Sequence, residues 1–276
     1  MAGDVFRIGV MAPGGTLAAE VAPAVQALAR ERFGDRLEIA FHPQCFERWG
    51  HFAGTDEARA RAFLDIANDP GFQALWFGRG GYGSNRIAPT VLAGLAPAAA
   101  DKAYLGYSDA GTLLSGLYGR GFGKVAHGPM PGDIRTAGGE AAVARGLSWL
   151  LDRDPAALEP SVGTEGPTCA FNLVILAHLV GTPAEPDLSG HVVMLEEVGE
   201  YMYRIDRDLC QVTQARGLSR IAGLRMGRCS AVPDNDPDFM LAEDAVARFW
   251  CERAGIPYLG RADIGHDPAN KVVPFG

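Results

Sequence analysis

Short apolar runs alternate with longer amphipathic runs over the first 150 residues of the chain. The apolar runs predict strands, and the amphipathic runs predict the helices between them. Strands that are apolar along nearly their whole length are typical of a parallel sheet with helices on both faces. The predicted strands are 7–13, 37–43, 73–78, 103–107 and 124–130, and the predicted helices are 21–34, 57–69, 110–121 and 139–152.

The second half of the chain follows a stretch that breaks this alternation. Residues 153–167 are rich in proline, glycine and polar residues and predict a linker. We therefore predict an α/β protein with a parallel, Rossmann-like or flavodoxin-like N-terminal domain over 1–152, a smaller C-terminal α/β domain over 168–276, and a cleft between them. The predicted helices beyond the linker are 170–181, 203–218 and 241–255, and the predicted strands are 190–198, 221–229 and 271–276.

Composition and charge exclude several classes of protein. The chain has 276 residues and a net charge of −8, and its 25 lysines and arginines are scattered. An acidic chain without a basic stripe repels phosphate backbones, so we expect no nucleic-acid partner. The N-terminal residues lack the pattern of a secretory signal, and no apolar run is long enough to span a membrane. We expect a cytoplasmic protein with no membrane partner.

The five cysteines are far apart and contain no Cys-x-x-Cys pair. This spacing indicates neither a disulfide framework nor a cysteine-rich zinc site, so we expect no metal and reduced thiols in a reducing compartment.

Ser108 carries the sharpest chemical signal in the sequence. It follows the predicted strand 103–107 and directly precedes a predicted helix, a position from which a serine presents its hydroxyl at the carboxyl edge of a sheet. The backbone N–H of Asp109 can then hold a developing oxyanion. Ala110 stands where the strict G-x-S-x-G elbow has glycine, so a simple helix N-cap at Ser108 or Asp109 is the alternative.

A glycine-rich loop follows the predicted strand 73–78. Its glycines let the backbone approach a ligand closely, and in a hydrolase the N–H of Gly81 would be the second oxyanion donor. The same loop fits the G-x-G-x-x-G pattern of dinucleotide-binding proteins, with Asp101 about twenty residues further on. That alternative is weakened because the loop follows the third strand instead of the first, and because Pro89 interrupts the next helix.

A nucleophilic serine needs a general base, and histidine has the most suitable pKa. His266 lies in a loop rich in Gly, Pro and Asn that can present a side chain to a cleft. Glu196 and Glu197 end a predicted strand, and one of them is expected to face inward and orient the imidazole. The other histidines are His42, His51, His127, His178 and His191.

Several segments together resemble the LD-carboxypeptidase family of murein tetrapeptide carboxypeptidases, which also contains the microcin C self-immunity hydrolases. The resemblance spans most of the chain in consistent order. Its blocks are GHFAGTDEARARAFLDIANDP, ALWFGRGGYGSNRI, YLGYSDAGTLL, HGPM, MLEEVGEYMYRIDRDL and GHDPANKVVPFG.

The resemblance implies a role for individual residues. Ser108 matches the family's nucleophile, Glu196 the first acid of its Leu-Glu-Asp motif, and His266 the histidine of its late Gly-His motif. The backbone of Gly81 and Asp109 matches its oxyanion hole. The implied activity is hydrolysis of the L–D amide bond that releases the terminal D-alanine from peptidoglycan tetrapeptides during cell-wall recycling, with no cofactor and with a homodimer as the family's assembly.

Two features bear on the substrate and on the partner of His266. Glu197 replaces the usual aspartate of the family motif, so either acid is a candidate partner. Arg79 and Arg86 are candidates to bind the terminal carboxylate of a muropeptide or other small peptide on charge grounds, and Asn172 is a third predicted substrate-binding residue. The alternative function is a related serine hydrolase that acts on a carboxamide or an acyl-nucleotide such as processed microcin C.

Overall fold

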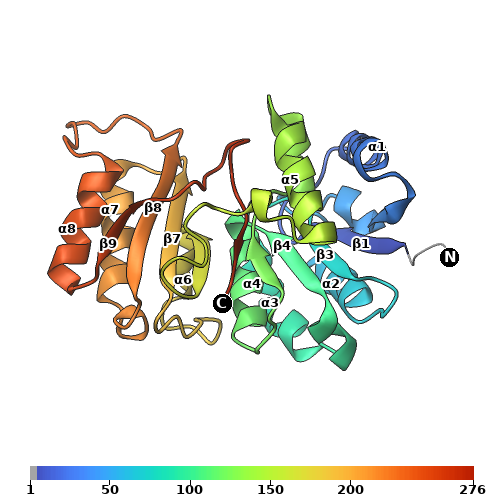
Figure 1. Cartoon of the computed structure of the whole chain (residues 1–276), viewed down its shortest axis with the longest axis horizontal. Coiled ribbons are helices and arrows are strands. Elements are labelled where there is room, and N and C mark those ends of the chain that lie inside the picture. The colour runs from blue at the N-terminus through green and yellow to red at the C-terminus, as the bar shows by residue number, and fades with distance from the viewer. Residues whose placement is uncertain (1–4) are drawn as a thin grey trace.

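The N-terminal half of the chain forms a six-stranded sheet with helices on both faces (Figure 1). The computed structural model describes residues 5–276. The strand order is β10-β5-β4-β3-β1-β2, and every neighbouring pair is parallel except β10 and β5. The strands are β1 (Phe6–Met11), β2 (Leu37–Phe41), β3 (Ala74–Phe77), β4 (Ala103–Gly106), β5 (Val125–His127) and β10 (Val273–Pro274).

Two helical layers cover this sheet, with α1 and α5 on one face and α2, α3 and α4 on the other (Figure 1). Successive residues of a strand point to opposite faces, which explains why Trp76 packs beneath the first layer and Phe77 beneath the second. The helices are α1 (Val21–Phe33), α2 (Asp56–Ala67), α3 (Ser84–Ala93), α4 (Gly111–Tyr118) and α5 (Gly139–Asp152).

The C-terminal half contains a second, parallel four-stranded sheet in the order β6-β7-β8-β9. The predicted α/β fold with two sheets is therefore confirmed. The elements are β6 (Thr168–Asn172), α6 (Leu173–Leu179), β7 (Val192–Val198), α7 (Met202–Gln214), β8 (Gly223–Ser230), α8 (Glu243–Ala254) and β9 (Tyr258–Arg261).

The prediction of one helix over 170–181 is wrong at its start, because 168–172 is the strand β6. All five residues of β6 are buried, so the run shows no alternation that would distinguish a strand from a buried helix. The change from strand to helix occurs at Asn172, whose side-chain oxygen accepts a hydrogen bond from the N–H of Ile175 at 3.3 Å. Strand β9, which has no fully buried residue, was not predicted.

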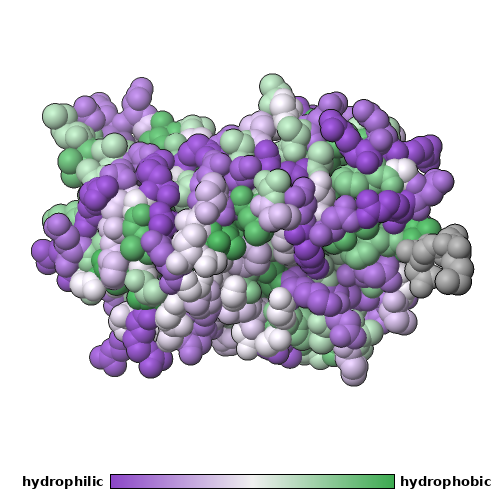
Figure 2. Space-filling model, in the orientation of Figure 1, coloured by the Kyte–Doolittle hydropathy of each residue, from purple (hydrophilic) through white to green (hydrophobic). Residues whose placement is uncertain are grey.

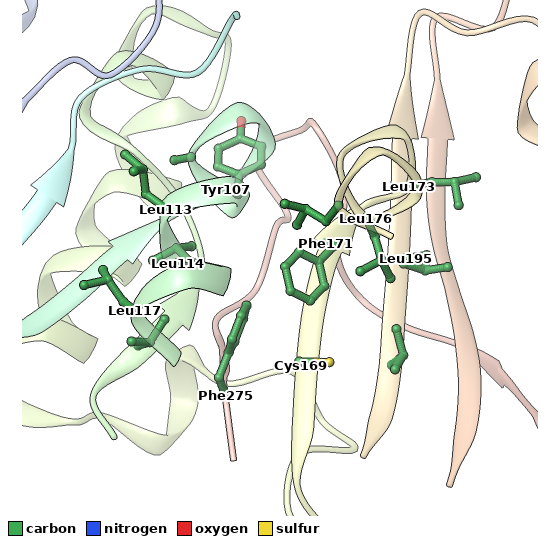
Figure 3. Packing of buried hydrophobic residues seen from close by; sticks show 14 of the residues in the cluster. Tyr107, Leu113, Leu114, Leu117, Cys169, Phe171, Leu173, Leu176, Leu195 and Phe275 are labelled. Carbon is green, nitrogen blue, oxygen red and sulfur yellow. The ribbon is translucent and has the colours of Figure 1, made fainter. Parts of the chain in front are cut away.

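The two halves share one apolar core where α4 packs against β6 and α6 (Figure 3). Phe275 of the tail packs against Phe171 of β6, with ring centroids 5.1 Å apart, and against Tyr118 of α4, at 5.6 Å. A Cβ on Gly111 would lie 3.5 Å from Phe171 and from Ile175, an ordinary contact distance, so α4 packs directly against β6 and α6 at this point. Helix α4 begins just after Ser108, so this core fixes the serine relative to the C-terminal sheet.

The C-terminal tail runs back between the two sheets (Figure 1). Val273 pairs with His127 of β5, and the N–H of Gly276 donates to the carbonyl of Thr168 on β6 at 2.9 Å. The predicted tail strand is therefore present, but it pairs with the N-terminal sheet. The predicted domain bounds of 1–152 and 168–276 stay a prediction.

The surface in Figure 2 mixes hydrophilic and hydrophobic residues over both halves. Within residues 5–276, no helix combines the length and apolarity needed to cross a membrane. All five cysteines are free thiols.

Candidate active site

Ser108 occupies a sharp turn between β4 and α4. Its φ is +59°, in the left-handed region that non-glycine residues rarely adopt. Strained residues of this kind gather at functional sites. Within residues 5–276, the Ser108 hydroxyl has no hydrogen-bond partner, and neither Ser108 nor Asp109 caps the following helix. The N-cap alternative is therefore not supported at this turn.

The glycine loop between β3 and α3 lies against Ser108. A Cβ on Gly80 would lie 3.0 Å from both Cβ and Oγ of Ser108, so only glycine leaves this space free. Gly81 has a φ of +102°, which again favours glycine. The loop therefore lies against the serine turn through Gly80, and Gly81 lines the same cavity as Ser108; its role as an oxyanion donor stays a prediction.

The buried carboxylate of Asp109 joins the serine turn to the glycine loop. It accepts hydrogen bonds from the N–H groups of Gly83 and Ser84, at 3.3 and 2.9 Å. These N–H groups begin α3, where a dinucleotide-binding protein would hold phosphate. A carboxylate already there repels phosphate, and Asp101 lies exposed in a separate 3-10 turn. The dinucleotide alternative is therefore disfavoured.

His266 and Glu196 form a hydrogen-bonded pair across the C-terminal half. Nδ1 of His266 lies 2.5 Å from Oε2 of Glu196, which is fully buried at the end of β7. Burial acts to lower the pKa of His266, but the charge and hydrogen bond of Glu196 outweigh it and raise that pKa above its ordinary value. The tautomer with hydrogen on Nδ1 leaves Nε2 free to accept a proton.

Glu197 faces the opposite side of β7 from Glu196. Its Oε1 accepts a hydrogen bond from Nδ2 of Asn172, and its Oε2 accepts one from the N–H of Val174, at 2.8 and 2.9 Å. Burial raises the pKa of Glu197 to about 7, although these hydrogen bonds oppose the shift. Of the two adjacent acids, Glu196 is the one that reaches His266.

The loop that carries His266 is fastened from both halves of the chain. Arg228 of β8 forms ion pairs with Asp263 and Asp267, on either side of His266. From α5, Arg145 donates hydrogen bonds from Nη1 to the carbonyls of Pro268 and Asn270, at 3.0 and 2.7 Å. Two arginines therefore limit the motion of the imidazole.

Ser108 and His266 line one cavity of about 290 Å³. No hydrogen bond joins the two side chains in the described part of the chain, a contact that is often long in ligand-free hydrolases. Other residues that line this cavity are Arg79, Gly80, Gly81 and Asp133. The arrangement therefore places a strained hydroxyl, a glycine loop and a carboxylate-bound imidazole around one space.

Comparison with known proteins assigns the family. A model described as the LD-carboxypeptidase N-terminal domain matches residues 8–128, and one described as the C-terminal domain matches 165–276. The chain belongs to the LD-carboxypeptidase family. A Synechocystis sp. relative, named only provisionally as a carboxypeptidase, is 30% identical over 258 residues, which are 87% of this chain and 79% of the relative.

Two further comparisons extend over almost the whole chain. The murein tetrapeptide carboxypeptidase of Pseudomonas aeruginosa is 25% identical over 98% of this chain and 91% of its own. The structure of a muramoyltetrapeptide carboxypeptidase from Oxalobacter formigenes matches with a TM-score of 0.80 and 24% identity, over 98% of this chain and 92% of its own. MccF in complex with glutamyl sulfamoyl guanosine matches with a TM-score of 0.78 and 15% identity, over 99% and 92%, which shows a shared fold.

The three predicted substrate-binding residues have different surroundings in this member of the family. Arg79 lines the cavity, and its Nη1 donates to the carbonyl of Thr16 at 2.8 Å. Arg86 forms an ion pair with Asp56, Nη2 to Oδ2 at 2.6 Å, and does not line the cavity. Asn172 holds Glu197 and begins α6. Among the three, only Arg79 has access to a substrate near Ser108; the roles of all three stay predictions.

Sequence reasoning missed Tyr107 and Asp133 near the catalytic candidates. The ring centroid of Tyr107 lies 4.8 Å from that of His266, and its hydroxyl donates to Oδ1 of Asp133 at 2.9 Å. Burial raises the pKa values of both Tyr107 and Asp133. The neighbouring His127 is buried, which lowers its pKa to about 4 and keeps it neutral. Nothing in the local sequence around 133 signals this contact.

A second cavity, of about 500 Å³, lies between α3, α4 and α6. Ser108 and His266 do not line it; both line the smaller cavity. No cluster of metal-ligating side chains occurs among residues 5–276.

Proposed function

We propose that this chain is a serine LD-carboxypeptidase that releases the terminal D-alanine from peptidoglycan tetrapeptides. The observation that supports this most is the common cavity of Ser108, at positive φ, and His266, already bound to Glu196. The relatives named as murein tetrapeptide carboxypeptidases support the substrate.

In the proposed reaction, Oγ of Ser108 attacks the carbonyl carbon of the L–D amide while Nε2 of His266 takes its proton. The N–H groups of Gly81 and Asp109 donate to the oxyanion that forms. Collapse of this intermediate breaks the C–N bond, and His266 returns the proton to the amine of the leaving D-alanine. Water then attacks the acyl-enzyme by the same proton route and restores Ser108.

Arg79 is the residue that we propose binds the terminal carboxylate. It is the predicted cationic residue at the cavity, and its protein partner is a neutral carbonyl. Arg86 has a carboxylate partner in Asp56, so its charge is already compensated. Location in the cytoplasm, a role in cell-wall recycling and a homodimer complete the proposal.

The alternative is a related hydrolase that acts on a carboxamide or an acyl-nucleotide. The likeness to MccF at 15% identity concerns the fold. The substrate that the chain cleaves therefore distinguishes the LD-carboxypeptidase from the alternative hydrolase. A panel of muropeptides and an aminoacyl sulfamoyl nucleoside is incubated with the chain, and products are identified by mass spectrometry. We expect D-alanine release from tetrapeptides, and none with Ser108→Ala. Cleavage of the nucleoside alone would favour the alternative, and unchanged release by Ser108→Ala would exclude this serine.

A further inference from the structure

An aromatic cluster lies on the surface beside the glycine loop. We call it the aromatic platform and define it as Trp49, His51, Phe52 and Tyr82. The ring centroids of Trp49 and Phe52 are 6.1 Å apart and nearly parallel, and Tyr82 lies 6.0 Å from Phe52 and 6.1 Å from His51. Trp49 is 52% exposed and Tyr82 49%, so core packing does not account for either ring.

The backbone sets the positions of these rings in advance. Trp49 and Phe52 exchange N–H to carbonyl hydrogen bonds at 2.9 and 3.0 Å. Gly50, at a φ of +58°, permits the tight turn between them. A ligand would therefore lose little free energy in ordering this surface.

Contacts of Arg59 and Thr16 hold the aromatic platform in place beside the glycine loop. The guanidinium of Arg59 lies 4.6 Å from the ring centroid of Phe52, and Nη1 of this buried arginine donates to the carbonyl of Gly83 at 2.9 Å. Tyr82 follows Gly81, which lines the cavity. On the other side, Oγ1 of Thr16 donates to the carbonyl of Glu47 at 2.7 Å. Tyr82 itself lines the second cavity, of about 500 Å³, so the platform lies one residue from the catalytic cavity and not in its wall.

The cavity is small for the proposed substrate. Its volume of about 290 Å³ is just below the roughly 300–1,000 Å³ that encloses a drug-sized ligand. The cleaved end of a muropeptide fills such a space, so the remainder, with its amino sugars, lies outside it. The platform begins one residue beyond Gly81 and is an exposed aromatic surface near the cavity.

We propose that the aromatic platform binds an amino-sugar ring carried by the substrate, which rests on the proposed function. A pyranose presents C–H groups on one face, and these pack against the electron-rich face of an aromatic ring. The rings of His51, Phe52 and Tyr82 are tilted at 43–81° to one another. This gives an uneven surface that suits a puckered sugar ring, whereas a flat nucleobase would stack on one ring at a time.

The test compares substrates with and without the sugars. Values of kcat/KM for D-alanine release are measured with the free tetrapeptide and with the same peptide on an N-acetylglucosaminyl-N-acetylmuramyl disaccharide. We expect Trp49→Ala to lower kcat/KM about five- to tenfold for the disaccharide substrate and to leave the free peptide unchanged. Phe249→Ala, at a ring 48% exposed on α8, is the matched control. Equal loss on both substrates, or no loss, would overturn the proposal.

A binding measurement separates this proposal from the proposed function. The peptide-free disaccharide and, separately, AMP are titrated into the wild type and Trp49→Ala and followed by NMR. Disaccharide binding that is lost in Trp49→Ala supports the platform even if neither peptide is cleaved. Absence of disaccharide binding, binding that Trp49→Ala does not change, or binding of AMP in its place would overturn it.

Discussion

Nδ1 of His266 lies 2.5 Å from Oε2 of Glu196, although the two residues are 70 positions apart in the chain. The other oxygen of this buried carboxylate, Oε1, has no hydrogen-bond partner in the described part of the chain. A buried charge is costly unless a partner compensates it. A protonated His266 compensates this carboxylate, and the carboxylate stabilises the protonated imidazole in turn.

Glu196→Gln should change both the rate and its dependence on pH. A general base works only when neutral, so activity falls as the pH drops through the pKa of His266. Glu196 raises that pKa against the effect of burial; without its charge the pKa falls and the acid limb moves to lower pH. We expect kcat/KM to fall about 10²- to 10⁴-fold. A profile from pH 4.5 to 9 tests this, and an unshifted acid limb would contradict it.

Ser108→Gly and Ser108→Ala should both be inactive but should differ in stability. Position 108 has a φ of +59°, which an alanine adopts only with strain and a glycine adopts freely. We expect the free energy of unfolding to be about 1 kcal/mol higher for the glycine variant than for the alanine variant. Chemical denaturation of the two proteins measures this difference. Equal stability would show that the turn carries no strain.

Gly80→Ala should impair catalysis without unfolding the protein. The added Cβ would lie 3.0 Å from Cβ and Oγ of Ser108, and the crowding moves the hydroxyl from its position. We expect a loss in kcat of about 10²-fold, as for misplaced catalytic groups generally. Gly123→Ala is the control, because a Cβ there meets no atom within 4 Å. Wild-type turnover by Gly80→Ala would show that this contact is not needed.

The sequence predicts the fold best where an element has a clear hydrophobic period or clear residues at its ends. Helix 139–152 is observed with these bounds, and the ends of the parallel strands of the first sheet lie within three residues of their predictions. Strand β6 was missed because it is buried on both faces, and β9 because it is short and lies at the edge of its sheet. Local pattern carries little information in either case.

The candidate site divides in a similar way. The turn at Ser108 is local, between a strand and a helix, so the sequence signals it directly. The contacts of Arg228 and Arg145 with the His266 loop are not local, since each joins residues at least 35 positions apart. The pairing of Arg86 with Asp56 spans 30 positions, and no local pattern indicated that this arginine already has a partner.

Arg228→Ala should lower kcat more than it raises KM. Arg228 pairs with Asp263 and Asp267, which flank His266, and its loss gives the imidazole more freedom. We expect kcat to fall about tenfold or more. Arg228→Lys should restore little, because one ammonium cannot bridge two carboxylates as a guanidinium does. Arg248→Ala removes an exposed pair on α8 and should have no effect. Equal losses at 228 and 248 would contradict a positioning role.

Glu197 should make the protein less stable as the pH rises from about 4.5 to 7. Burial raises the pKa of Glu197 from 4.5 to about 7 in the folded protein, so the folded state binds a proton that the unfolded state has already lost in this window. Stability is therefore highest below the unfolded pKa and is lost as the pH rises through the folded one. The difference corresponds to about 3 kcal/mol.

Glu197→Gln tests this contribution, because an amide does not titrate. The amide nitrogen of the glutamine faces N–H groups that donate hydrogen bonds to the carboxylate in the wild type. The resulting loss of stability is the same at every pH. The free energy of unfolding is measured by denaturation for both proteins between pH 4 and 8. We expect the wild type to lose about 3 kcal/mol more than the variant over this range. Parallel curves would show that Glu197 keeps an ordinary pKa, and that its hydrogen bonds to Asn172, Val174 and Val198 outweigh burial.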